Sequence, residues 1–198
     1  MKLRHLAAIV ALALTTVAAH AQTDGNVGLY FNPIATLATN SVADTGPYAF
    51  LGQNSKSQVF YGFDMGGYYN FFHSGSLSAG GDIRYSDLHA NNALLKDFLV
   101  GVRVSASPFS RPFKPYVQAS IGSGTTKAPY STVRVSKVTY AVFGGVDYTL
   151  ARHVVYRIFE VGYGSLTTVS SATVGAGGNI PIPQTPLINF STGLVFRF

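Results

Sequence analysis

Eight segments of the chain alternate apolar and polar side chains with a period of two, which is the repeat of an extended strand. In the clearest segment, residues 76–85, Leu77 and Ile83 share one face, while Asp82 and Arg84 share the other. The other segments are 27–38, 57–72, 97–106, 116–121, 138–148, 154–163 and 187–198. Beyond the first residues no apolar run is long enough for a membrane helix. The pattern therefore predicts an all-β protein.

One segment departs from strict alternation. In 154–163 the apolar parity changes near Ile158 and Phe159. A β-bulge at that pair would keep Arg157 and Glu160 on the same polar face.

The connections between the segments alternate in length. Longer polar stretches lie near 39–56, 87–95, 123–134 and 165–186, and shorter turns lie near 73–75, 107–114 and 149–152. Transmembrane barrels with up-and-down topology have long loops outside the cell and short turns in the periplasm. The layout predicts an eight-stranded antiparallel up-and-down transmembrane β-barrel.

The first residues predict export. Lys2 and Arg4 precede an apolar stretch at 6–17, and Ala19-His20-Ala21 has the form of a cleavage site. We expect a signal peptide over 1–21 and an outer-membrane barrel domain over 22–198. The chain has no cysteine, so no disulfide framework is expected.

A soluble eight-stranded barrel such as a lipocalin shows the same alternation, but with apolar side chains inside and polar side chains outside. The residue types on the polar face distinguish the two classes. Here Ser, Gly, Thr and Asp dominate the polar face, and its acids are nearly balanced by arginines, as in an enclosed set. Aromatic residues gather toward both ends of the segments, as in membrane barrels. We expect a polar network inside the barrel, made by Asp64, Asp82, Arg84, Asp97, Arg103, Gln118, Asp147, Arg157, Glu160 and Arg197.

Three stretches carry a family resemblance. They are Pro115-Tyr116-Val117, the run 144–148 that leads into the Arg157 strand, and the ending 190–198. With them the chain resembles the OmpA/OmpX-type family of eight-stranded outer-membrane barrels, without the peptidoglycan-binding domain that follows the barrel in full-length OmpA. The resemblance implies location in the outer membrane of a Gram-negative bacterium. It also implies that the barrel assembly machinery reads a signal made by Phe190, Leu194, Phe196 and Phe198.

An eight-stranded barrel is just wide enough for side chains to fill it. We therefore expect a structural and surface-interaction protein that acts through loops 39–56 and 165–186. A small pore or a conduit for small or hydrophobic solutes is the alternative, because many inward residues are small. An enzyme that modifies lipid A is a third hypothesis. It is weaker, because His73 and His153 lie in predicted periplasmic turns and His89 has no serine beside it, so we expect no catalytic residues.

The remaining expectations concern partners. The cations Lys127, Arg134 and Lys137 near the outer rim are candidates for contacts with lipopolysaccharide phosphates. The three histidines beyond the predicted signal peptide are scattered, and the chain has no cysteine, which predicts no metal site and no cofactor. The net charge of +6 is too dispersed for nucleic-acid binding. We expect a monomer surrounded by outer-membrane lipid.

Overall fold

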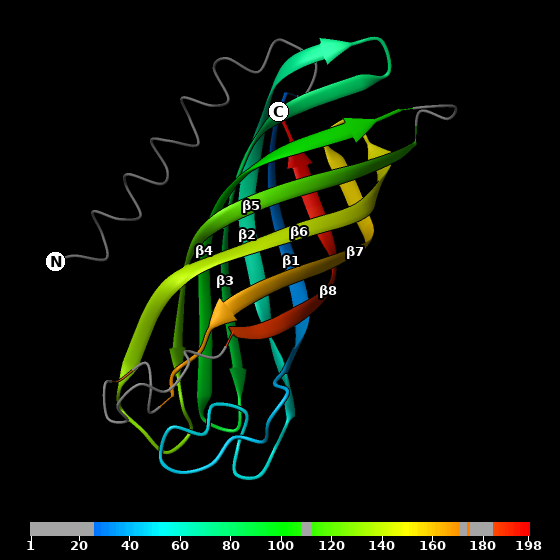
Figure 1. The fold of residues 1–198 in the computed structure, drawn as a ribbon. Coiled ribbons are helices and arrows are strands. Elements are labelled where there is room, and N and C mark those ends of the chain that lie inside the picture. The colour runs from blue at the N-terminus through cyan, green and yellow to red at the C-terminus, as the bar shows by residue number, and fades with distance from the viewer. Residues whose placement is uncertain (1–25, 108–111, 171–173, 175–183) are drawn as a thin grey trace, which may run out of the picture.

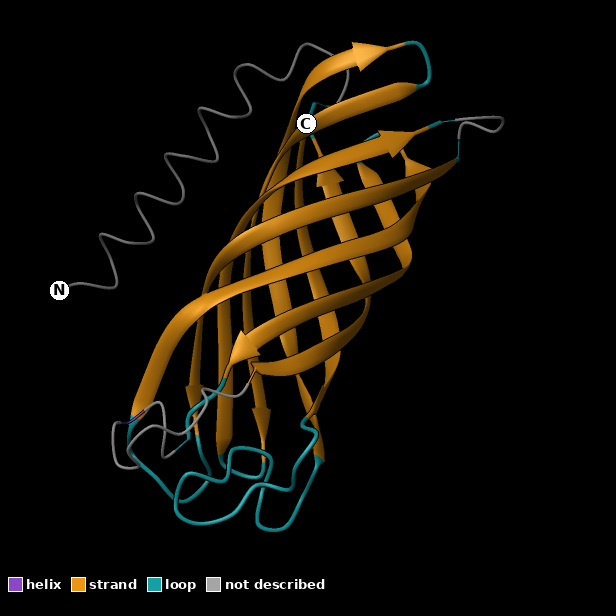
Figure 2. Cartoon of the chain, in the orientation of Figure 1, coloured by secondary structure: helices purple, strands orange, loops and turns teal. Residues whose placement is uncertain are grey.

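The computed structural model describes residues 26–107, 112–170, 174 and 184–198, and the signal peptide predicted over 1–21 lies outside them. The described residues form eight strands in one closed ring (Figures 1 and 2). They are β1 (Val27–Thr39), β2 (Ser57–Ser74), β3 (Leu77–Ala90), β4 (Ala93–Ala106), β5 (Phe113–Lys127), β6 (Arg134–Ala151), β7 (Val154–Thr167) and β8 (Gln184–Arg197). Within this part of the chain, no helix has the length and apolarity needed to cross a membrane.

Closure of the ring depends on the pairing of β1 with β8. Their antiparallel register runs from Gly28 opposite Arg197 to Ala38 opposite Leu187. The backbones of Val27 and Phe198 add two hydrogen bonds, from Val27 N to Phe198 O at 3.3 Å and from Phe198 N to Val27 O at 3.0 Å. A closed ring leaves no sheet edge, which is the condition for β-strands to lie in hydrocarbon.

The two ends of the barrel differ in their connections. Short turns after β2, β4 and β6 lie at the end where β8 finishes, and we call this the turn end (Figure 1). The connections after β1, β3, β5 and β7 lie at the opposite end, the loop end, where the 40–56 segment forms the large cyan loop (Figure 1). The predicted turn at 107–114 falls partly outside the described residues.

The predicted loop at 87–95 is wrong. β3 continues to Ala90 and β4 begins at Ala93, so only Asn91 and Asn92 form the connection. Both have positive φ, at 44° and 67°. Two such residues in succession suit a type I′ hairpin turn, and asparagine tolerates this conformation better than most residues. His89, expected in a loop, therefore lies on β3.

The predicted loop at 123–134 is too long for a similar reason. β5 extends to Lys127 and β6 starts at Arg134, which leaves residues 128–133 as the connection. Thr125 Oγ1 and Ser136 Oγ lie 2.7 Å apart, and this hydrogen bond joins the two strands across the extension. Polar side chains on an extended hairpin weaken the apolar alternation, so the sequence pattern ended too early.

The bulge predicted in the seventh segment is confirmed. Phe159 lies opposite Val146 and Arg157 lies opposite Asp147, so Ile158 has no partner on β6. The extra residue restores the parity, and Arg157 and Glu160 are both buried inside the barrel.

The two faces of the wall are chemically opposite. Outward side chains such as Phe31, Ile83, Val102 and Ile121 are more than half exposed. Inward side chains of the strands are buried and include seven charged residues. An exposed apolar belt around a polar interior is typical of membrane barrels.

Candidate functional site

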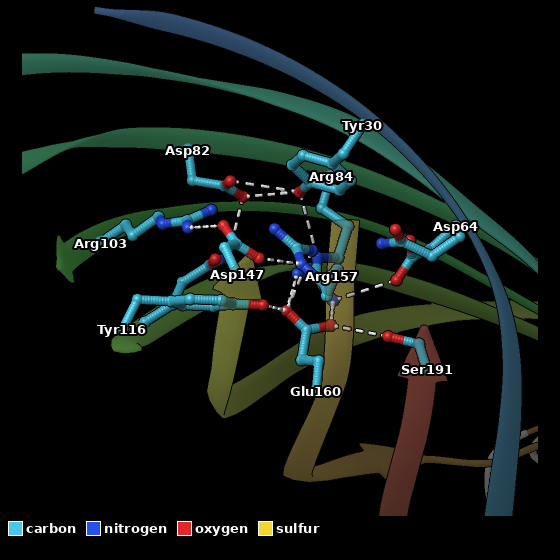
Figure 3. A network of polar contacts seen from close by, with 12 residues as sticks. Tyr30, Asp64, Asp82, Arg84, Arg103, Tyr116, Asp147, Arg157, Glu160 and Ser191 are labelled. Carbon is cyan, nitrogen blue, oxygen red and sulfur yellow. Dashed lines mark hydrogen bonds and ion pairs between the residues drawn. The ribbon is translucent and has the colours of Figure 1, made fainter. Parts of the chain in front are cut away.

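A cluster of buried charged residues fills the middle of the barrel (Figure 3). The strands carry these residues at inward positions, so alternation along each strand, together with the bulge in β7, brings them to one interior. The cluster contains eight of the predicted network residues. We call them the central polar cluster: Asp64, Asp82, Arg84, Arg103, Gln118, Asp147, Arg157 and Glu160.

Glu160 on β7 accepts more hydrogen bonds than any other residue of the cluster. Arg84 binds it with two parallel contacts, Nη1 to Oε1 at 2.6 Å and Nη2 to Oε2 at 2.7 Å. Tyr116 Oη donates to Oε2 at 2.5 Å and Ser191 Oγ donates to Oε1 at 3.1 Å. Paired planar contacts of this kind are the strongest geometry for an arginine and a carboxylate.

A second pairing centre lies at Asp147 on β6. Arg103 Nη2 contacts its Oδ2 at 2.6 Å and Arg157 Nε contacts its Oδ1 at 3.1 Å. Arg157 Nη1 also lies 3.3 Å from Glu160 Oε2. Arg157 therefore joins the two carboxylates into one network that crosses the lumen.

The remaining acids of the cluster, Asp82 and Asp64, accept hydrogen bonds from side chains of β1 and of other strands. Tyr30 Oη donates to Asp82 Oδ1 at 3.0 Å, and Gln118 Nε2 donates to the same oxygen at 2.7 Å. Asp64 accepts from Asn32 Nδ2 at 2.6 Å and pairs with Arg84 Nη1 at 3.1 Å. Each buried carboxylate of the cluster is thus hydrogen-bonded, which offsets its desolvation.

Aromatic rings cover the arginines on their flat sides. The guanidinium carbon of Arg103 lies 3.7 Å from the ring centre of Tyr116 and 4.3 Å from that of Tyr68. That of Arg84 lies 4.0 Å from the ring centre of Phe143. These contacts favour a cation in a buried site. Sequence reasoning did not include these aromatic residues in the network.

Each of these rings lies opposite a glycine on the next strand. Four inward pairs share this geometry, and a Cβ atom added at any of the four glycines would collide with the facing ring. The cross-strand pairs are Gly28 with Tyr68, Gly66 with Tyr30, Gly145 with Tyr116 and Gly162 with Phe143. The glycines therefore provide space for rings rather than leaving the lumen open.

Two predicted network residues do not join the cluster. Asp97 is partly exposed as a whole residue, but its Oδ1 is buried and has no hydrogen-bond partner among the described residues. Arg197 lies at the turn end, where its Nε donates to Tyr68 Oη at 2.9 Å. The alternation placed both side chains inward, but their height along the barrel separates them from the other charges.

A second barrier lies between the central polar cluster and the loop end. Apolar side chains from seven strands and from three connections pack there, and Phe50 stacks on Phe60 with ring centres 5.0 Å apart. We call this set the loop-end apolar cluster: Ile34, Ala38, Phe50, Leu51, Phe60, Leu88, Ala93, Leu95, Ala128, Val135, Leu166, Val169 and Leu187.

The loop expected outside over 39–56 is therefore partly inside. Ala49, Phe50 and Leu51 are buried. Asp44 organises the loop, since it accepts from Asn40 Nδ2 at 2.8 Å and from Leu51 N at 2.9 Å. In the other loop, expected over 165–186, β7 continues to Thr167 and β8 begins at Gln184, and much of the segment between them lies outside the described residues.

The candidate lipopolysaccharide contacts divide between two faces. Lys127 and Arg134 are direct partners across β5 and β6. Lys137 is exposed but shares its face of β6 with the buried residues Val135 and Thr139. The structure brings the first two cations together and places the third on the opposite face.

The candidate assembly residues lie on the outer face of β8. Phe190, Leu194 and Phe196 are exposed toward the surroundings of the barrel, and Phe198 is half-exposed. Among the described residues, no group of three or more His, Cys, Asp or Glu side chains is placed to hold a metal ion.

The comparisons with known proteins concern the fold. A scan against protein-family models found no match, and a search of curated proteins found none either. Among solved structures, Neisserial surface protein A (NspA) is 14% identical with a TM-score of 0.57, over 87% of this chain and 97% of NspA. Ail, the attachment invasion locus protein of Yersinia pestis, is 11% identical with a TM-score of 0.52, over 89% of this chain and 100% of Ail.

These likenesses extend over nearly the whole of both partners. Together with the closed ring of eight antiparallel strands, they show the architecture, while function has to be argued from the residues. The chain has the fold of the eight-stranded outer-membrane β-barrels.

Proposed function

We propose that the protein is an integral outer-membrane barrel of the OmpA/OmpX type that acts as a structural and surface-interaction protein. The loop end faces the outside of a Gram-negative cell and the turn end faces the periplasm. The short turns and the position of β8 at the turn end support this orientation. The barrel is a monomer in lipid, and the barrel assembly machinery recognises Phe190, Leu194, Phe196 and Phe198 on β8.

The filled lumen is the observation that carries this proposal. The central polar cluster crosses the interior, and Arg84, Arg157 and Glu160 within it are at most 1% exposed. The loop-end apolar cluster closes the interior a second time. Water and ions would have to displace both sets of side chains to pass. A barrel filled in this way suits a structural and surface-interaction role better than a role in transport.

Wild-type protein reconstituted in planar bilayers is expected to show no steady conductance step. The double variant Phe50→Ala/Leu51→Ala is expected to behave in the same way, because the central polar cluster still fills the lumen when the outer barrier is weakened. Single-channel recording measures both, with a large general porin as the positive control. A stable conductance in the wild-type protein would contradict the filled-lumen proposal.

The loop end offers a shaped surface for contacts. Hydrogen bonds to Asp44 order the 40–56 loop, and Val42 in that loop is 73% exposed. Tyr130, between β5 and β6, is 71% exposed. Ordered loops that expose apolar side chains lose little entropy on binding a partner. Ail, of similar fold, is an attachment protein, and we extend to this chain only the proposal of contacts at the cell surface.

Lipopolysaccharide is the partner that we propose at the outer rim. Replacement of Lys127 and Arg134 together by Gln is expected to weaken binding to lipopolysaccharide about 30-fold, at about 1 kcal/mol for each cation near an anionic surface. Lys137→Gln is the matched control, and less than a threefold change is expected because it lies on the other face. Titration of the purified protein with lipopolysaccharide micelles measures all three. An equal loss in the Lys137 variant would contradict the assignment.

The alternative function is a conduit for small or hydrophobic solutes through the barrel wall. The interrupted pairing of β1 with β8 is the feature that bears on this alternative. Pro33 has no backbone N–H, and the pairing of β1 with β8 skips from Phe31 opposite Leu194 to Ile34 opposite Ser191. A groove of about 320 Å³ opens there toward the lipid. Its inner wall is Ser191, which donates to Glu160. An apolar solute entering there would meet the charged cluster, so the geometry favours lipid contact over passage.

Catalysis is not part of the proposal. His89 Nε2 lies 3.0 Å from Asp87 Oδ1, which resembles half of a catalytic pair. Asp87 also pairs with Lys96 Nζ at 2.7 Å and accepts from Tyr85 Oη at 3.3 Å. The pair belongs to a surface ion cluster on β3 and β4, and this ion pairing explains its geometry without a reaction.

A further inference from the structure

A polar cavity of about 460 Å³ opens at the turn end of the barrel. Residues of the turns after β2, β4 and β6 line it, together with the last residues of β8. Inside it, Ser78 Oγ and Ser105 Oγ lie 2.8 Å apart. When one hydroxyl donates to the other, the second hydroxyl keeps its own proton to donate elsewhere. The volume is within the range of small-molecule sites.

The charge of this cavity is one-sided. Five basic side chains line it: His73, Lys114, Arg152, His153 and Arg197. None of the five forms an ion pair with an acidic side chain of the described residues, whereas each arginine of the central polar cluster does. Lys114, Arg152 and Arg197 outnumber the one carboxyl group of Phe198 in this cavity, so its net charge is positive.

One of these cations is partly buried, and another is oriented by hydrogen bonds. Lys114 is only half-exposed, on the inward face of β5 next to Tyr116. Arg197 Nε donates to Tyr68 Oη at 2.9 Å, and the backbone N of Arg197 donates to His153 O at 2.9 Å. The bond to Tyr68 uses only Nε of Arg197. It therefore orients the guanidinium group and leaves the N–H groups of Nη1 and Nη2 available to donate to a ligand. Cations gathered at the wall of a cavity repel one another until an anion joins them.

We propose that this turn-end cavity binds a phosphate group, carried by a soluble phosphate ester or by the headgroup of an anionic lipid. Arginine, lysine and hydroxyl donors around one polar cavity are the donor set that suits phosphate oxygens. The inference depends on the proposed function only for its compartment, since the turn end faces the periplasm in the proposed orientation. Binding itself depends neither on a closed lumen nor on a role for the loops.

The test uses the full chain refolded in zwitterionic micelles and titrated with inorganic phosphate at low ionic strength by calorimetry. The wild-type protein is expected to bind phosphate, and Lys114→Gln/Arg152→Gln is expected to bind at least about tenfold more weakly. Lys56→Gln/Lys137→Gln is the matched control, because it removes the same charge away from the cavity. Circular dichroism verifies that both variants are folded.

A second arm identifies the source of the phosphate. Native mass spectrometry of protein from nanodiscs that mix phosphatidylglycerol with phosphatidylcholine detects retained lipid. Retained phosphatidylglycerol that is lost in Lys114→Gln/Arg152→Gln supports a headgroup, and phosphate binding in micelles without retained lipid supports a soluble ester. Equal binding by the two double variants, or no phosphate binding together with no retained anionic lipid, overturns the proposal. Neither result would alter the conductance expected of the barrel.

Discussion

Replacement of Glu160 by Gln is expected to lower the free energy of unfolding by about 3–5 kcal/mol, the usual cost of breaking a buried ion pair on one side. Glu160 accepts two contacts from Arg84 and one each from Arg157, Tyr116 and Ser191. The variant preserves the shape of the side chain but leaves the buried Arg84 with a weaker partner. Urea unfolding in micelles, followed by circular dichroism, measures the change.

The double variant Arg84→Met/Glu160→Gln separates lost pairing from lost packing. Because the two residues contact each other directly, the double variant should cost clearly less than the sum of the single variants. Asp97→Asn is the matched control, since that carboxylate stands apart from the cluster. A change within about 1 kcal/mol is expected there. Additive costs for Arg84 and Glu160 would show that the cluster does not act as a unit.

Replacement of Gly80 by Val is expected to destabilise the barrel by about 3 kcal/mol or more, at the upper end of overpacking costs. A Cβ atom at Gly80 would collide with the backbone of Tyr69 and lie 2.8 Å from Asn70 Cα on β2. β2 has a register shift between Asn70 and Phe72 at this level. Backbone cannot rotate away as a side chain can, so the strands would have to separate.

Gly81→Val is the matched control, one residue along the same strand. A Cβ atom there meets nothing within 4 Å. Valine favours strands and suits the apolar outer face, so a neutral or slightly stabilising effect is expected. The folded fraction after refolding into lipid vesicles compares the two variants. Similar losses at both positions would mean that the clash at Gly80 does not control the outcome.

The sequence predicted the architecture because one physical rule acts along every strand. A wall with lipid on one side and a closed interior on the other requires alternation, and the alternation identified eight strands and the buried charges at 64, 82, 84, 103, 147, 157 and 160. The bulge at Ile158 was also readable, because it is a break in the same rule.

The prediction was wrong where the interior is apolar. Leu88 and Leu95 are buried at the loop end, whereas Asp87, His89 and Lys96 lie on the opposite face of β3 and β4. The apolar residues are therefore on the inner face there, and the alternation of the membrane-facing part does not continue. Residues 87–95 were interpreted as a loop for that reason. Phe50 and Leu51 gave no periodic signal either, because a loop that folds back into a barrel has no repeat.

The sequence by itself determined which side chains face inward, because parity is a local property of an extended chain. Only the tertiary structure decided which of them meet. Register placed Tyr68 against Gly28 and Tyr116 against Gly145. Height along the barrel joined Arg84 to Glu160 and left Asp97 and Arg197 apart. Register and height follow from closing all eight strands together, and no single strand contains that information.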